Sequence, residues 1–275
     1  CMDTVTTKVK DMYENYPYPS TRIINVAIGN RIKRDLKSRN FPLSGLKILD
    51  AGCGTGEKAI SLAKAFPDSV VTGWDMTENS LKSARELAEQ EGVKNIQFEH
   101  VDLMGVDISK NKDRFDLIIS WGVIHHLSDS VKGLKNLGGC LKKDGLMYIW
   151  VYGLIALATY EVKQFRQVIH TLLPNERFSY DKGIKVAKEL KNLCRTVNSS
   201  PLNDLIMRIK WFFDPDVDKK QILSHLLKNF GKVRYSSVYD IGLVDLFLHA
   251  NEKEYDIDLV LDEVQQAGLV FIDSI

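Results

Sequence analysis

The sequence predicts an α/β fold of the doubly wound kind, built on a mostly parallel sheet. Three observations predict it. Apolar runs of strand length alternate with helical patterns over residues 46–152. The first run meets an acid and then glycines at every second position, and the second run ends in another acid about 20 residues later. Such short apolar runs suit strands that are buried on both faces, as parallel strands are.

The first strand covers residues 47–51 and leads into the turn Gly52-Cys53-Gly54-Thr55-Gly56. The three glycines can adopt positive φ, and they lack the Cβ atoms that would keep a ligand away from the main chain. A helix is expected from Glu57, with its free N–H groups facing the same ligand. The dinucleotide fingerprint needs a third glycine three positions after the second, where this chain has Glu57. The turn therefore predicts a nucleotide site of another kind.

The later elements follow in the order of the same fold. The second strand, 70–75, ends in Asp75, whose two carboxylate oxygens can accept from a ribose diol. A helix is expected at 77–90 and a third strand at 96–100.

The fourth strand, 115–120, brings Trp121, His125 and His126 to the carboxyl edge of the sheet, where open α/β sheets bind ligands. A helix at 130–143, stopped by Asp144 and Gly145, and a fifth strand at 146–152 complete five βα repeats.

The acid-x-Gly-x-Gly-x-Gly order of residues 50–56 resembles the first motif of the class I S-adenosylmethionine-dependent methyltransferases, and three further motifs follow in register to residue 152. The resemblance implies S-adenosylmethionine as the cofactor. In that family, the acid after the third strand accepts from the adenine amino group and its neighbour packs on the ring; Asp102 and Leu103 hold these positions. The expected cofactor-binding residues are Asp50, Gly52, Cys53, Gly54, Gly56, Asp75, Met76, Asp102, Leu103, Ser120 and Trp121.

The composition indicates a soluble enzyme. The 275 residues include 37 basic and 36 acidic side chains, for a net charge of +1, which argues against nucleic acid as a partner. The four cysteines are too scattered for a metal clip and too few for a disulfide scaffold. Because Cys53 lies in the glycine turn and Cys140 in an apolar helix, we expect reduced thiols and a cytoplasmic protein. No leader pattern or bilayer-length apolar stretch is found, so no membrane partner is expected. The oligomeric state stays open.

Two segments are additional to the minimal fold. Residues 1–45 form an arm whose prolines, Pro17 and Pro19, forbid a continuing helix. The arm is either a lid, with Tyr13 or Tyr18 over the cofactor and substrate, or a segment that only packs on the sheet. Residues 153–235 carry helical patterns at 154–173, 181–195, 202–212 and 217–230. They form either a cap over the active site or an insert for packing or oligomerisation.

Residues 236–275 are expected to return to the core, through a last helix at 256–267 and a sixth strand at 269–272. The family fold adds a seventh, antiparallel strand beside the sixth, and this strand is missing or replaced here. Residues 232–239 are the only local candidate for it.

The chemistry of methyl transfer needs few side chains, because the sulfonium methyl is already activated. If the acceptor is a hydroxyl or an ammonium, a base must take its proton, and histidine suits this role near neutral pH. His125 or His126 is the candidate; the alternative is a pair that makes structural hydrogen bonds. Asp245 and His249, four residues apart, would share one side of the chain.

Asp245, His249 and Tyr255, with Tyr13 and Tyr18, are the expected substrate residues. Asp245 and His249 fall short of the three protein ligands that a catalytic zinc site usually has, so no metal site is expected.

Three functions remain open on the sequence. The first is a methyltransferase that moves a methyl group to an oxygen or nitrogen of a small-molecule acceptor by in-line displacement. The second is a nicotinamide-dependent oxidoreductase, which Glu57 at the third-glycine position disfavours. The third is a non-catalytic S-adenosylmethionine-binding module of a larger assembly.

Overall fold

The computed structural model describes residues 2–19, 22–153, 166–174, 179–197 and 240–273. The chain divides into two compact units, one of residues 1–153 with 250–275 and one of residues 154–249. The sheet lies in the first unit. Within the second unit, the described helices are residues 166–172, α8 (Tyr180–Val197) and α11 (Asp240–Phe247).

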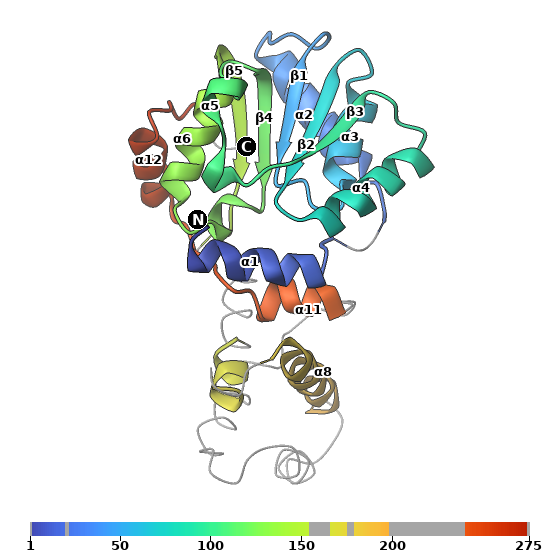
Figure 1. Ribbon diagram of the computed structural model, residues 1–275, viewed down its shortest axis with the longest axis vertical. Helices are drawn as coiled ribbons and strands as arrows, with labels where there is room; N and C mark the ends of the chain where they lie inside the picture. The colour runs from blue at the N-terminus through green and yellow to red at the C-terminus, as the bar shows by residue number, and fades with distance from the viewer. Residues whose placement is uncertain (1, 20–21, 154–165, 175–178, 198–239, 274–275) are drawn as a thin grey trace. The chain divides into compact units, whose positions relative to one another are not determined.

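The first unit is built on one parallel sheet of five strands, with the order β3-β2-β1-β4-β5 (Figure 1). The strands are β1 (Lys47–Ala51), β2 (Val70–Asp75), β3 (Ile96–His100), β4 (Phe115–Trp121) and β5 (Leu141–Trp150). The chain moves outward from β1 to β3 and then returns to the other side of β1 for β4. The order therefore reverses between β1 and β4, and such a switch point is where open α/β sheets bind ligands.

Helices cover both faces of this sheet, because neighbouring residues of a strand point to opposite faces. Ile48 packs with α2 (Val26–Ser38), α3 (Glu57–Ala65) and part of α4 (Glu78–Gln90). Leu49 packs with α6 (Ser130–Cys140) on the other face, beside α12 (Ile257–Gln266) and the short α5 (Ile108–Asn111). The sheet is thus the middle layer of three.

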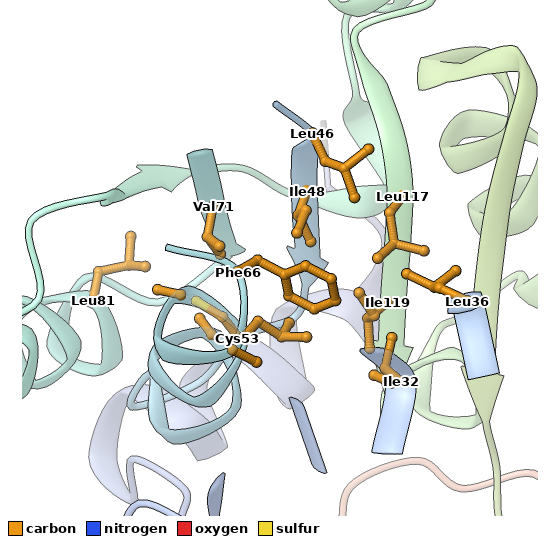
Figure 2. Close-up of a cluster of buried hydrophobic side chains, with 14 residues drawn as sticks. Ile32, Leu36, Leu46, Ile48, Cys53, Phe66, Val71, Leu81, Leu117 and Ile119 are labelled. Carbon is orange, nitrogen blue, oxygen red and sulfur yellow. The ribbon is translucent and has the colours of Figure 1, made fainter. Parts of the chain in front are cut away.

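Phe66, which directly follows α3, lies in the middle of the α2 side of the core. Figure 2 shows its ring between Ile32 and Leu36 of α2 and the sheet residues Ile48 and Val71. All five side chains are at most 2% exposed. Burying a side chain of this size contributes about 1.5–3 kcal/mol to folding. The cluster therefore fixes β1 and β2, the strands from whose ends the next turns begin.

The first four predicted strands and the helices at 77–90, 181–195 and 256–267 are confirmed within two or three residues. The boundary between α6 and β5 was predicted wrongly: α6 ends at Cys140 and β5 already begins at Leu141. Phe115 pairs with Leu141 and Leu117 with Leu146, so residues 142–145 bulge opposite Asp116. Lys142 at the bulge ion-pairs with Asp116 at 2.7 Å, a contact that local helix patterns do not reveal.

The predicted sixth strand is also wrong, because residues 269–273 have no regular secondary structure. Val270 is 86% exposed, whereas a strand of a parallel sheet would bury it. Leu269 packs near Gly138 of α6, and Asp273 accepts two hydrogen bonds from Arg39 at 2.8 and 2.9 Å. The segment is therefore held by side chains rather than by a strand ladder.

In the second unit, Gly183 of α8 lies against Leu248, which follows α11, and a Cβ atom at Gly183 would stand 2.7 Å from that leucine side chain. The helical patterns at 202–212 and 217–230 and the strand-like residues 232–239 fall outside the described residues. Among the helices that are described, none has the length and apolar character needed to cross a membrane.

Candidate functional site

The turn after β1 has the backbone that its glycines predicted. Gly52, Gly54 and Gly56 have φ values of 79°, 52° and 86°, in the left-handed region. The N–H groups of Gly52 and Cys53 both donate to the carbonyl of Trp74 at 2.8 Å, which ties the turn to β2. A Cβ atom at Gly56 would stand 2.7 Å from the Cβ of Ala84, so α4 packs directly against the start of α3.

Asp75 joins this turn to the end of β2. Its Oδ2 accepts from the Gly54 N–H at 2.9 Å, and its Oδ1 accepts from the N–H and the hydroxyl of Thr77 at 2.9 and 2.7 Å. Burial raises the pKa of Asp75 while these hydrogen bonds oppose the rise. Each carboxylate oxygen has two lone pairs, so Oδ2 can accept one further hydrogen bond. The ribose role of Asp75 stays a prediction.

Asp50, the acid directly before the turn, lies inside the core at 1% exposure. Among the residues that the structure describes, its Oδ2 has no hydrogen-bond partner. Burial raises the pKa of Asp50 to about 6, against a lowering by the charge of Lys58. A buried carboxylate oxygen without a partner is costly unless a cation or a donor reaches it.

The remaining predicted cofactor residues lie at the carboxyl ends of β2, β3 and β4. Asp102 follows β3, and its Oδ1 accepts from the Met104 N–H at 2.9 Å. Leu103 is buried, and the Met76 carbonyl is 2.8 Å from Nε2 of His100. Ser120 is fully buried in β4, with its hydroxyl donating to the Ala51 carbonyl at 3.3 Å. Their contacts with a cofactor stay predictions.

Aromatic rings gather where β4 and β5 end. Trp121 and Trp150 stack at 5.6 Å with an angle of 8° between their planes. Tyr152 lies 4.4 Å from the His125 ring, and the two histidine rings are 3.9 Å apart. Trp150 and Tyr152 were not among the predicted site residues. The spacing of Trp150 and Tyr152 in the predicted strand 146–152 could have indicated them, since alternate residues of a strand share a face.

The two histidines are held by a segment that the sequence did not indicate. His125 and His126 lie in the short 3-10 helix η2 (Ile124–His126), at 0% and 6% exposure. Nδ1 of His126 is 2.9 Å from the carbonyl of Asn251. The Asn251 amide donates back to the carbonyls of His126 and Leu127, and the Lys253 N–H donates to the carbonyl of His125 at 2.8 Å.

The N-terminal arm reaches the glycine turn. Helix α1 (Thr4–Asn15) ends before Pro17, as predicted, and Glu14 accepts from Asn79 at the start of α4. The Tyr18 carbonyl accepts from the Thr55 N–H at 3.3 Å, and a Cβ atom at Gly54 would stand 2.2 Å from that oxygen. The arm therefore lies against the turn, while its function as a lid stays a prediction.

The predicted substrate residues are divided between the two units. Tyr13 is partly buried in α1, and Tyr18 is 36% exposed. The Tyr255 hydroxyl donates to Glu263 of α12 at 2.7 Å. In the second unit, one carboxylate oxygen of Asp245 lies within 4.8 Å of a ring nitrogen of His249, which confirms that the two share a side. Substrate roles for these five stay predictions.

Comparisons with known proteins agree with this geometry. A family described as "Methyltransferase domain" matches residues 42–231, more than half of the chain. An uncharacterized protein of Synechococcus sp. is 26% identical over 98% of this chain and 60% of its own length. The ubiquinone biosynthesis O-methyltransferase of Actinobacillus pleuropneumoniae is 30% identical over 57% of this chain and 66% of its own.

The corresponding enzyme of Coxiella burnetii is 27% identical over 51% of this chain, and the chain covers 58% of its length. The chain thus spans about 60% of the curated relatives that it matches first. Among solved structures, PKMT2 from Rickettsia typhi in complex with AdoHcy covers 91% of this chain and 44% of its own, at 18% identity and a TM-score of 0.59. This likeness shows the fold alone.

The family match, the parallel sheet and the glycine turn agree with one another, and the alternative of a nicotinamide-dependent oxidoreductase is therefore wrong. S-adenosylmethionine is the cofactor of the family. The chain belongs to the methyltransferase domain family, and its parallel sheet and glycine turn have the class I fold.

Proposed function

We propose that this chain moves the methyl group of S-adenosylmethionine to an oxygen or nitrogen atom of a small-molecule acceptor in the cytoplasm. The observation that carries the proposal is the pair of buried histidines at the end of β4, beside the rings of Trp121, Trp150 and Tyr152. Imidazole can take a proton near neutral pH, and the aromatic rings offer faces for a flat or cationic acceptor.

The residues around the glycine turn fit the cofactor. S-adenosylmethionine carries an ammonium group and a sulfonium centre, both cationic. Asp50 supplies a buried carboxylate oxygen that has no partner among the described residues, and Asp75 supplies a second carboxylate at the end of β2. Asp50 and Asp75 would therefore hold cationic or hydroxyl groups of the cofactor, and Asp102 with Leu103 would hold its adenine.

The bound cofactor supplies an activated methyl group. What the protein must add is alignment of the acceptor with the S–CH3 bond, and such positioning is worth up to about 7–11 kcal/mol in well-oriented systems. For a hydroxyl acceptor, His125 or His126 would also take the proton as the new O–CH3 bond forms. The ubiquinone biosynthesis O-methyltransferases among the relatives support an oxygen acceptor of this kind.

Methyl transfer is tested with radiolabelled S-adenosylmethionine. The chain is incubated separately with the dialysable small molecules and with the dialysed proteins of a cell extract. We expect label in the small-molecule fraction, at a rate that falls at least tenfold in His126→Gln if this histidine is the base. The surface variant His170→Gln is the matched control.

Label found only in the protein fraction would replace the small-molecule acceptor with a protein one. A third result is tight cofactor binding in calorimetry without transfer in either fraction. That result would favour the non-catalytic binding module and contradict the proposal.

A further inference from the structure

We propose that His125, His126 and Glu252 form a binding site for a divalent transition-metal ion of the Zn²⁺ type. Each of the three residues offers one ligand atom, and these atoms all lie within 4.8 Å of one another. The sequence predicted no metal site, because Asp245 and His249 are only two ligands and no local pattern places Glu252 beside the histidine pair.

The donor set has the composition of known metal sites. Two imidazole nitrogens and one carboxylate oxygen are the ligands of several catalytic zinc sites, which keep a fourth position open. Ligand atoms that lie about 2.1 Å from an ion in a tetrahedral site are about 3.4 Å from one another. The ligand atoms here are at most 4.8 Å apart, so small side-chain rotations would bring them to that distance. Imidazole ligands favour Zn²⁺, Cu²⁺, Fe²⁺ or Ni²⁺ over Mg²⁺ or Ca²⁺, which prefer oxygen.

The hydrogen bond of His126 supports the same assignment. A carbonyl oxygen can only accept, so Nδ1 of His126 carries the proton that it donates to Asn251 at 2.9 Å. In the neutral ring, the lone pair then lies on Nε2. Histidines that bind metals generally donate their other ring N–H to a carbonyl or carboxylate, which fixes the tautomer and the ring orientation.

The backbone on both sides of the cluster is fixed. Asn251 and Lys253, the two neighbours of Glu252, are hydrogen-bonded to the backbone of residues 125–127. The Lys253 side chain also ion-pairs with Glu263 of α12, which is 3% exposed. Because Glu252 sits between these two anchors, its carboxylate is carried by a segment that cannot move freely away from the histidines.

Burial adds to the attraction for an ion. Both imidazoles are at most 6% exposed, and the His125 ring packs 4.4 Å from Tyr152. A cation in such surroundings is screened weakly by water, so its attraction to the Glu252 carboxylate is stronger than on the surface.

A bound ion would change the expected chemistry, and this step alone rests on the proposed function. With Nδ1 donating and Nε2 ligating, His126 has no lone pair left to act as a base. The open position of the ion could instead bind an acceptor hydroxyl and lower its pKa, as zinc does for water. Metal binding itself is measured without cofactor or acceptor, so its outcome is separate from that of methyl transfer.

The test starts from the untagged chain, stripped of metal with a chelator and then dialysed against Zn²⁺ or Co²⁺. We expect one ion per chain by mass spectrometry, visible Co²⁺ absorption typical of low coordination number, and loss of the ion at acid pH as the histidines protonate. His126→Gln and Glu252→Gln should each weaken the affinity more than tenfold, since even loss of an outer hydrogen-bonding partner costs about 10–100-fold.

His170→Gln and Glu89→Gln remove the same groups from exposed positions and should retain the ion. If the wild-type chain retains no ion above the dialysis background, or if the site variants bind as tightly as these controls, the proposal is wrong. Where a variant fails to fold, X-ray absorption of the Zn²⁺-loaded wild type tests the proposal. The proposal requires two imidazole ligands, and a spectrum without them would contradict it.

Discussion

The buried carboxylate of Asp50 predicts how stability and cofactor binding respond to pH. Asp50→Asn keeps the shape of the side chain and removes its charge. The pKa of Asp50 is raised by burial from 3.8 to about 6. Each pKa unit corresponds to about 1.4 kcal/mol, so keeping the ionised group in the core costs about 3 kcal/mol above pH 7.

The direction in which stability changes with pH follows from the number of protons bound by the folded and unfolded chains. Below pH 3.8 Asp50 is protonated in both folded and unfolded chains and contributes nothing. Between pH 3.8 and about 6 the folded chain binds the proton and the unfolded chain does not, so stability falls as pH rises. The cost is about 1–2 kcal/mol at pH 5 and about 3 kcal/mol at pH 7. Asp50→Asn should remove this slope.

Urea unfolding of the cofactor-free chain at pH 5 and pH 7 measures the slope. The exposed variant Asp68→Asn is the matched control and should change stability by at most about 0.5 kcal/mol. Cofactor binding should change in the opposite direction from stability. Asp50→Asn should bind S-adenosylhomocysteine about 10–100-fold more weakly than the wild-type chain, because it loses a hydrogen bond to a charged group. A variant with the wild-type pH slope and the wild-type affinity would refute the reasoning.

Three further variants test other contacts. Gly54→Val should abolish cofactor binding in calorimetry, because its side chain would meet the Tyr18 carbonyl and resist a φ of 52°; normal binding by the folded variant would exclude the turn as the site. Asp75→Ala should weaken cofactor affinity by about 1–3 kcal/mol, since it removes the acceptor of the Gly54 N–H and the proposed ribose acceptor; unchanged affinity would contradict that role. Glu263→Ala leaves two buried hydroxyls, of Ser130 and Tyr255, without their acceptor, and should lower the free energy of unfolding by about 2–6 kcal/mol in urea; a loss under about 0.5 kcal/mol would show that the network adds little.

The parts of the fold that the sequence predicted are those set by local patterns. Residues 47–51 and 115–120 are short, mostly apolar runs of the length typical of buried strands, and the glycines after the first run adopt positive φ. The last helix, predicted at 256–267, forms at Ile257–Gln266, and the structure shows that the Asp256 side chain caps it.

The parts that it missed depend on contacts distant in the chain. Residues 269–272 have the composition of a strand, yet a strand also needs a partner, and Leu269 packs on α6 instead. The bulge in β5 depends on the register with β4, and Lys142 within it pairs with Asp116 of that strand. Glu252 beside His126 follows from hydrogen bonds across 125 residues of sequence, which no local pattern encodes.

Because β1 and β4 are neighbouring parallel strands, the residues that follow them lie at the same edge of the sheet. Two groups of polar residues therefore stand at this edge, each with its own hydrogen bonds. The glycine turn follows β1 and is held by β2 through Trp74 and Asp75. The histidine pair follows β4 and is held by residues 251–253. Because the two groups share none of these hydrogen bonds, a substitution in one group should leave binding at the other unchanged. Gly54→Val should lose the cofactor and keep the ion, and Glu252→Gln should lose the ion and keep the cofactor. Loss of both ligands in either variant, with the fold intact by circular dichroism, would mean that the two groups depend on each other.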